Sequence, residues 1–168
     1  MRQWAIISLS LFFIGLCAFT AESRERRDPF SAQFADDVIR VQPGETFQFK
    51  VKFKVPKNHY LYDDKTVLLF DQKADFDQIQ SYRPAAEDHY DNFFKKNLKV
   101  HFKDFQQTIF FKVPPGAKPG RRTLEARLKY QGCSDDFCYR PVKKTILLPV
   151  EVVPPLAQLS DAASPGVP

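Results

Sequence analysis

Apolar and polar residues alternate strictly through one stretch in the first half of the chain. The apolar positions of this stretch are Phe47, Phe49, Val51, Phe53 and Val55, and every residue between them is polar. Successive side chains of a β-strand point to opposite faces of a sheet, so this period of two predicts a strand with one buried face. The same alternation returns at residues 124–130 and predicts a second strand of this kind.

Five shorter apolar stretches are further strand candidates. They cover residues 38–41, 66–70, 98–102, 108–113 and 145–153. Turn-forming proline, glycine and asparagine residues at 42–45, 55–58 and 114–120 separate several of these stretches. No window combines a helical period with a helical length. Short strands separated by such turns predict an all-β sandwich.

The two ends of the chain differ from its middle. Arg2 precedes an uncharged apolar stretch that ends in mostly small residues, so residues 1–21 are predicted to be a secretory signal peptide. An uncleaved membrane anchor is the alternative, and a lipid on Cys17 fits less well because Leu16 before it is bulky. Residues 22–28 form a charged leader, and the proline-rich residues 154–168 predict a disordered tail. The folded domain is therefore expected at 29–153.

Composition excludes several classes of protein. The chain is 43% hydrophobic and 27% charged, which argues against a disordered protein and against one made only of membrane spans. Its net charge of +5 is mild and its 20 acids are interleaved with the bases, so we expect no nucleic-acid partner. The alternating Lys50, Lys52 and Lys54 are interpreted as the solvated face of a strand.

Two close cysteines carry the candidate chemistry. Cys133 follows one predicted strand and Cys138 shortly precedes the next, so the pair is expected at the accessible tip of a hairpin-like connection. In an exported protein such a pair is able to form a disulfide, and the simplest interpretation is a structural staple. The closed loop has only about six residues, for which chain entropy predicts ~2 kcal/mol of stabilisation against ~3 kcal/mol for a fifteen-residue loop. A role other than stability thereby gains weight.

Other uses of the cysteines have less support. A zinc site would need both cysteines and two of the three histidines His59, His89 and His101, but no Cys-x-x-Cys or His-x-x-x-His spacing is present. A Cys-His hydrolase needs one free cysteine rather than a close pair. No Cys-x-x-Cys-His motif for haem attachment occurs in the chain.

The cysteine segment at 130–141 carries a family resemblance. Its pattern Tyr-Gln-Gly-Cys…Phe-Cys-Tyr-x-Pro resembles the N-terminal periplasmic domain of DsbD, the thiol:disulfide interchange protein of Gram-negative bacteria. The segment at 58–62 is similar to the tyrosine pair of that family, and the segment at 91–94 to its cap loop. The resemblance covers most of 29–153. It implies an immunoglobulin-like β-sandwich with one redox-active disulfide, although the tryptophan and the widely spaced cysteines of antibody domains are missing.

The resemblance also implies roles for individual residues. Cys138 matches the cysteine that forms mixed disulfides with partners, and Cys133 matches the cysteine that resolves them. Phe93 matches the cap aromatic residue, with Asp91 and Phe94 beside it. The aromatic residues expected near the cysteine pair are Tyr60, Tyr62, Phe137 and Tyr139. We expect Asp91, Asp135 and Asp136 to disfavour a thiolate, so that the reduced pair stays unreactive until a partner displaces the cap loop.

The function implied by the resemblance is thiol-disulfide exchange in the periplasm, as a protein-disulfide reductase. Reducing equivalents would come from a membrane thiol transporter or a thioredoxin-like donor. They would pass to periplasmic disulfide proteins, such as disulfide isomerases and the thioredoxin-like proteins of cytochrome c maturation. No cofactor, metal or small-molecule substrate is expected, because the cysteines themselves carry the electrons. A non-enzymatic binding or scaffolding module with a structural disulfide is the alternative.

The chain departs from the family pattern in several places. Four residues separate the cysteines, one fewer than in the family. Lys95 stands where glycine is common, Asn92 where a carboxylate is common, and Arg140 where proline is common. DsbD continues into a membrane domain, whereas this sequence ends after the proline-rich stretch, so we expect a free-standing version that works with separately encoded membrane partners.

Overall fold

A computed structural model describes residues 27–35, 37–71 and 76–155 of the chain. The predicted signal peptide at 1–21, most of the charged leader and residues 156–168 of the predicted tail lie outside these ranges. Across the described ranges, the chain forms no helix with the length and apolar character needed to cross a membrane.

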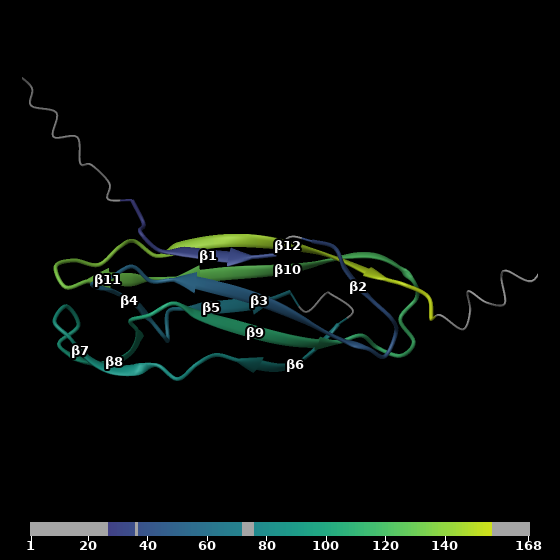
Figure 1. Cartoon of the computed structure of the whole chain (residues 1–168), viewed down its shortest axis with the longest axis horizontal. Helices are drawn as coiled ribbons and strands as arrows, with labels where there is room; N and C mark the ends of the chain where they lie inside the picture. The colour runs from purple at the N-terminus through teal and green to yellow at the C-terminus, as the bar shows by residue number, and fades with distance from the viewer. Residues whose placement is uncertain (1–26, 36, 72–75, 156–168) are drawn as a thin grey trace, which may run out of the picture.

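The described residues form twelve β-strands in three sheets. In chain order they are β1 (Ser31–Phe34), β2 (Ile39–Val41), β3 (Thr46–Lys54), β4 (His59–Tyr62), β5 (Val67–Phe70), β6 (Asp77–Tyr82), β7 (Glu87–Asp91), β8 (Lys96–His101), β9 (Phe105–Lys112), β10 (Gly120–Tyr130), β11 (Gly132–Ser134) and β12 (Val142–Val152). Two four-stranded sheets, β1-β3-β9-β6 and β2-β12-β10-β5, form the layers of the sandwich (Figure 1). All pairs are antiparallel except the parallel pair β2–β12.

The alternation of β3 fills the space between the two layers. Its apolar side chains are buried and its polar ones exposed, residue by residue. Phe53 stacks on Phe105 with ring centroids 4.7 Å apart, and Phe47 stacks on Phe111 at 5.2 Å. The facing strands β10 and β12 contribute aliphatic side chains to the same core cluster. The all-β, immunoglobulin-like sandwich predicted from the sequence is confirmed in this architecture.

A third sheet, β11-β4-β8-β7, lies at one end of the sandwich, which is the left end in Figure 1. We call this the disulfide end. Tyr60, Tyr62, Val100 and Cys133 form a small buried cluster of their own there. The main sandwich thereby supports a separate layer that carries the cysteine segment.

All seven predicted strands are confirmed, with shifted ends. Five strands, β1, β4, β6, β7 and β11, are absent from the sequence prediction. In β6 all six residues are exposed, so burial imposes no alternation on its sequence. Conversely, three consecutive residues of β4 are buried, and β11 has only three residues. Neither the β4 sequence nor the β11 sequence therefore shows an apolar–polar alternation long enough to detect.

Candidate functional site

The cysteine segment is the connection between β10 and β12, whose last pair is Tyr130 and Val142. Cys133 lies on β11, which pairs with β4, and forms a disulfide with Cys138. Cys133 is 0% exposed, whereas Cys138 is partly exposed. The hairpin-like connection is therefore confirmed, but the expected accessibility holds for Cys138 and is wrong for Cys133, because Cys133 is buried in a cluster with Tyr60, Tyr62 and Val100.

A hydrogen-bonded turn holds the two cysteines together. The Ser134 backbone N–H donates to the Phe137 carbonyl at 2.9 Å, and the Ser134 hydroxyl oxygen accepts from the N–H groups of Asp136 and Phe137 at 3.3 Å. Beyond the turn, the Tyr139 N–H donates to the Gly132 carbonyl at 3.0 Å. The loop conformation is thus fixed by its own backbone and by one serine.

Close packing under β11 leaves no room for a side chain at Gly132. A Cβ atom there would lie 2.4 Å from the ring of Phe30 and 2.4 Å from the carbonyl oxygen of Tyr60. A Cβ atom essentially never approaches a non-bonded atom this closely. Glycine at this position lets β11 and its cysteine lie directly against β4.

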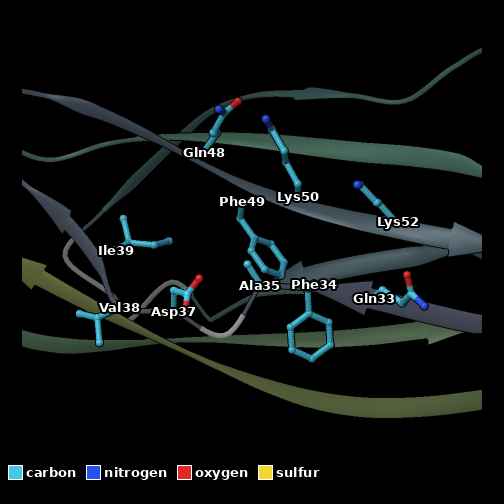
Figure 2. Close-up of a pocket in the computed structure, with 10 residues that line it drawn as sticks. All are labelled: Gln33, Phe34, Ala35, Asp37, Val38, Ile39, Gln48, Phe49, Lys50 and Lys52. Carbon is cyan, nitrogen blue, oxygen red and sulfur yellow. The ribbon is translucent and has the colours of Figure 1, made fainter.

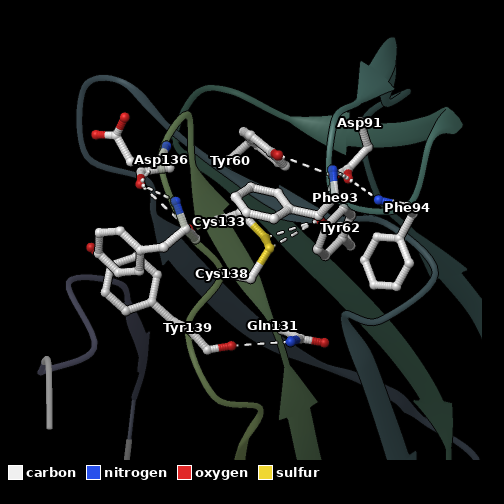
Figure 3. The surroundings of a disulfide bond; sticks show 12 residues. Tyr60, Tyr62, Asp91, Phe93, Phe94, Gln131, Cys133, Asp136, Cys138 and Tyr139 are labelled. Atoms are coloured by element: carbon white, nitrogen blue, oxygen red, sulfur yellow. Dashed lines mark hydrogen bonds between the residues drawn. A yellow bond between two sulfur atoms is a disulfide. The ribbon is translucent and has the colours of Figure 1, made fainter. Parts of the chain in front are cut away.

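Three polar groups link the disulfide to the cap loop at 91–94 (Figure 3). The Tyr62 hydroxyl lies 2.9 Å from the Cys133 sulfur and 3.5 Å from the Cys138 sulfur. The same hydroxyl donates a short hydrogen bond to an Asp91 carboxylate oxygen, to which the Tyr60 hydroxyl also donates at 3.0 Å. The tyrosine pair and Asp91, which the family resemblance places beside the cysteines, therefore form one cluster with them.

Asp91 also shapes the cap loop. Its second carboxylate oxygen accepts the backbone N–H groups of Phe93 and Phe94, each at 2.8 Å. The Phe93 side chain points from this loop towards the disulfide, whereas the Phe94 ring lies on Tyr62 at 5.8 Å (Figure 3). Phe93 and Phe94 remain 45% and 46% exposed. Two large apolar side chains are thus held at the surface beside the cysteines.

Burial and hydrogen bonding set the charges of this cluster. Burial of Asp91 acts to raise its pKa, but the donors Tyr62, Phe94 N–H, Tyr60 and Phe93 N–H outweigh this effect and lower the pKa below its ordinary value. Burial and the hydrogen bond to Asp91 raise the pKa of Tyr60 to about 12 and raise that of Tyr62 further. At neutral pH a buried carboxylate therefore accepts from two protonated phenols.

Several neighbours of the site were not predicted. The ammonium of Lys65 lies 4.2 Å from the Tyr62 ring centroid and 3.9 Å from that of Phe94, so it bridges the tyrosine to the cap loop. Ser134, which fixes the turn, is signalled in the sequence only by its place before two aspartates. Lys65 has no sequence signal, because the fold alone brings it to Phe94.

The opposite side of the disulfide is aromatic. The Tyr139 hydroxyl lies 3.0 Å from His59 Nε2, and the Tyr139 ring meets Phe137 at 4.6 Å and Phe30 at 5.6 Å. The amide of Gln131 donates to the Tyr139 carbonyl at 3.0 Å. Phe137 and Tyr139 thus pack against each other within the cysteine segment, while Asp136 is exposed in the turn.

His59 packs against Tyr139, and His101 Nε2 donates to an Asp63 carboxylate oxygen at 2.9 Å, so neither histidine meets the cysteines as a ligand would. Over the described ranges, no group of three or more His, Cys, Asp or Glu side chains is arranged to hold a metal ion. A cavity of about 530 Å³ lies elsewhere, between β1, β2 and β3, and is lined by side chains such as Phe34, Phe49 and Lys50 (Figure 2). None of the disulfide-end residues lines it.

The family match and the curated relative of this chain both point to the same protein family. Residues 29–149 match the family described as "Thiol:disulfide interchange protein DsbD, N-terminal". The chain is 28% identical over 141 residues to the thiol:disulfide interchange protein DsbD of Pseudomonas fluorescens, a match that covers 78% of this chain and 21% of that protein. The chain thus spans about a fifth of the length of the curated relative it matches.

Solved structures of DsbD N-terminal domains are also similar. The reduced N-terminal domain from Neisseria meningitidis is 24% identical, with a TM-score of 0.49 and coverage of 71% of this chain and 83% of that one. The complex between the DsbD N-terminal and PilB N-terminal domains of the same organism gives 21% identity, a TM-score of 0.49 and coverage of 70% and 80%.

Proposed function

The chain belongs to the family of DsbD N-terminal domains, and on this premise we propose that it exchanges thiols and disulfides with other proteins through Cys133 and Cys138. The observation that carries the proposal is the disulfide itself, with one buried and one partly exposed cysteine next to a polar and aromatic cluster. A staple needs no such cluster, whereas an exchange site needs control over when its sulfurs react.

In the reductive direction two electrons leave the pair in two steps. The Cys138 thiolate attacks one sulfur of a partner disulfide, which forms a mixed disulfide and releases the partner's other sulfur as a thiolate. The Cys133 thiolate then attacks the Cys138 sulfur, forms the intramolecular disulfide and releases the partner's second thiolate. The partner disulfide is reduced to two thiols, the pair is oxidised, and the two protons of the pair pass to the partner sulfurs through solvent.

A donor dithiol restores the pair by the reverse steps. Its thiolate attacks Cys138, releases Cys133 and is itself oxidised in the second step. The assignment of Cys138 to the partner side is supported by its partial exposure, because an incoming sulfur needs a path to the atom it attacks. Full burial of Cys133 suits a resolving cysteine, which meets only Cys138.

Tyr62 and Asp91 would keep the reduced cysteines unreactive by opposing formation of a thiolate. Tyr62 has one hydroxyl proton, which it donates to Asp91. Its oxygen lone pairs therefore remain to accept a hydrogen bond from a cysteine S–H once the disulfide is reduced. A hydrogen bond that only the neutral thiol can donate, together with the Asp91 charge, opposes formation of the thiolate. Movement of the cap loop would withdraw both effects.

We propose the periplasm as the site of action and thioredoxin-like proteins as the partner class. Disulfide isomerases and a membrane thiol transporter complete the proposed relay. The support for this compartment and these partners is family membership, together with the predicted signal peptide. The electron flow from a membrane donor to periplasmic acceptors, including those of cytochrome c maturation, rests on the same support.

A scaffolding module with a structural disulfide is the second candidate. Complete burial of Cys133 and the tight turn at Ser134 favour it, because both protect the bond from exchange. Under this candidate neither cysteine would form an adduct with a partner while the protein remains folded.

Trapping of a mixed disulfide separates the two candidates. A thioredoxin-like protein with a single active-site cysteine, activated as its thionitrobenzoate disulfide, is mixed with the Cys133→Ala variant. The proposal predicts a covalent adduct through Cys138 and stoichiometric release of thionitrobenzoate. The matched Cys138→Ala variant keeps only the buried sulfur and should form little adduct. Absence of an adduct with Cys133→Ala, or equal adducts with both variants, would overturn the assignment.

A further inference from the structure

A basic groove lies on the outer face of the sheet β2-β12-β10-β5. It has a volume of about 500 Å³ and is bounded by β5, β10 and β12. The residues that line it are Val67, Leu69, Arg127, Leu128, Lys129, Lys143, Lys144 and Thr145. Four of these eight residues are cations and none is an acid, so the groove presents a concentrated positive charge around aliphatic side chains.

The cations of the groove have no ionic partners within the described chain. Arg127, Lys129, Lys143 and Lys144 take part in none of the ion pairs formed by the described residues, whereas Arg40 and Arg121 further along the same sheet both bind Glu151. Because the four groove cations have no acidic partner among the described residues, their positive charge is available to bind another molecule.

Two of these lysines face each other across the sheet. Lys129 of β10 and Lys143 of β12 are register partners, and both are exposed. Like charges directly opposite each other on neighbouring strands destabilise a sheet. No ion pair of the described residues compensates for the repulsion between these two lysines. Such an uncompensated pair is expected where a bound anionic surface offsets the repulsion.

Exposed leucines accompany the charge. Leu69, which pairs with Arg127, is 56% exposed, and Leu147, two residues beyond Thr145 on β12, is 61% exposed. The next acid on this face, Glu125, pairs with Leu147 and marks the limit of the basic region. Apolar side chains within a ring of charges are typical of surfaces that bind other proteins.

The groove is continuous with the disulfide end. Lys129 precedes Tyr130, after which the chain enters the cysteine segment, and Lys143 follows Val142, where the chain leaves it. Gly132 lies three positions beyond Lys129, which corresponds to about 10 Å of extended chain. The pKa of Lys65, which bridges Tyr62 and Phe94, is lowered first by burial and also by the charges of Lys96 and Lys129. A protein that presents a sulfur to Cys138 therefore has the groove within reach.

We propose that the basic groove docks the redox partner through a contact surface in which carboxylates surround an aliphatic side chain. This inference rests on the proposed function and adds the chemistry of the partner. Carboxylates would neutralise the facing lysines, and an aliphatic side chain would cover Leu69. Long-range attraction would also speed encounter with partners of this kind.

Paired peptides test the proposal. An extended chain rises about 3.3 Å per residue, so a peptide of about ten residues reaches about 33 Å, which exceeds the length of extended chain between Arg127 and Gly132. One peptide carries an activated thiopyridyl disulfide at its first residue followed by glutamates and leucine, and the second has glutamine for every glutamate. The reduced protein should react about tenfold faster with the acidic peptide at low salt, and the preference should shrink as salt rises.

Charge reversal locates the effect. The Lys129→Glu/Lys143→Glu variant should lose the preference for the acidic peptide and react normally with the neutral one. The control Lys50→Glu/Lys52→Glu changes the net charge equally on exposed positions of β3 and should keep the preference. Thermal unfolding of both variants checks that they are folded.

The outcomes separate the two proposals. No reaction with either peptide would contradict the proposed exchange function. Equal reaction with both peptides, or equal loss of preference in both variants, would overturn the groove as a docking site while leaving exchange intact. The docking site is likewise overturned if the groove variant loses binding to phosphatidylglycerol vesicles but keeps the peptide preference, since the groove would then serve a membrane surface.

Discussion

The phenolic oxygen of Tyr62 lies 2.9 Å from the sulfur of Cys133. Because the same hydroxyl donates to the Asp91 carboxylate, which accepts the backbone N–H groups of Phe93 and Phe94, one tyrosine connects the disulfide to the cap loop. Any movement of the cap loop that carries Asp91 with it changes the hydrogen bonding of Tyr62 next to the sulfurs. The geometry therefore couples the position of the loop to the chemistry of the cysteines.

Removal of the Asp91 charge should make the reduced pair reactive at lower pH. The pKa of Asp91 is lowered from 3.8, so its carboxylate stays ionised throughout the range in which a thiol titrates. In Asp91→Asn the negative charge that opposes a thiolate is gone. The pH at which alkylation of reduced Cys138 reaches half its maximal rate should fall by roughly one unit, the effect of a charge several ångströms away in a partly buried site.

The control for this measurement is Asp136→Asn, which removes an exposed charge in the turn. Solvent screens that charge, so the pH midpoint of alkylation should move much less. A midpoint that stays in place or rises in Asp91→Asn contradicts the restraining role of the Tyr62–Asp91 pair.

Truncation of Phe93 should expose the reduced cysteines. Full burial of a phenylalanine is worth roughly 1.5–3 kcal/mol, and Phe93 is about half buried. Loss of its side chain should therefore favour the open loop by about 1 kcal/mol and speed alkylation by iodoacetamide about fivefold. Tyr82→Ala, which truncates an exposed aromatic residue of β6, should leave the rate unchanged. An unchanged rate in Phe93→Ala would remove the shielding role of this side chain.

A methyl group at Gly132 should destabilise the fold. The added Cβ would meet the Phe30 ring and the Tyr60 carbonyl oxygen, and the carbonyl belongs to the β4 backbone and has little freedom to move. Overpacking of this kind should lower the free energy of unfolding by about 2–3 kcal/mol in urea denaturation. Gly116→Ala adds the same methyl group where no atom lies within 4 Å, and its stability should match that of the wild type. Similar losses in both variants would contradict close packing under β11.

The strand pattern was predictable where one face of a strand is buried and the other is wet. The alternation in β3 is visible in its sequence because the buried face needs apolar residues and the solvent-exposed face needs polar ones. The wholly exposed β6 carries no such demand, and its place at the sheet edge depends on pairing with β9. Burial of Cys133 was missed because it depends on β4, which lies more than seventy residues earlier in the chain.

Family resemblance supplied the site residues, but not the contacts among them. The bridge from Lys65 to Phe94 and the pair of His59 with Tyr139 join residues far apart in the sequence. Spacing along the chain has no information on such contacts. At one departure from the family pattern the structure shows why glycine suits the position: Lys95 has a φ of 55°, in the left-handed region that glycine adopts without strain.

Placing glycine at position 95 should stabilise the protein. The left-handed conformation costs a non-glycine residue about 1–2 kcal/mol, and glycine avoids this cost. Part of the gain is lost, because glycine gives up more backbone entropy on folding than lysine does. Lys95→Gly should therefore raise the free energy of unfolding by about 0.5–1 kcal/mol. The neighbouring Lys96→Gly, at the start of β8, should lower it instead. If Lys95→Gly is the less stable of the two variants, strain at this corner of the cap loop is not relieved by glycine.

The reduction potential of the Cys133–Cys138 pair tests the central claim most directly. The protein is equilibrated in buffers of defined thiol and disulfide ratio, quenched by alkylation and scored by mass. We predict a value between roughly −270 and −120 mV, the range of proteins that cycle between dithiol and disulfide. A value below about −300 mV would contradict the exchange function and favour the scaffolding module, because a disulfide with so low a potential is not reduced by thiol partners.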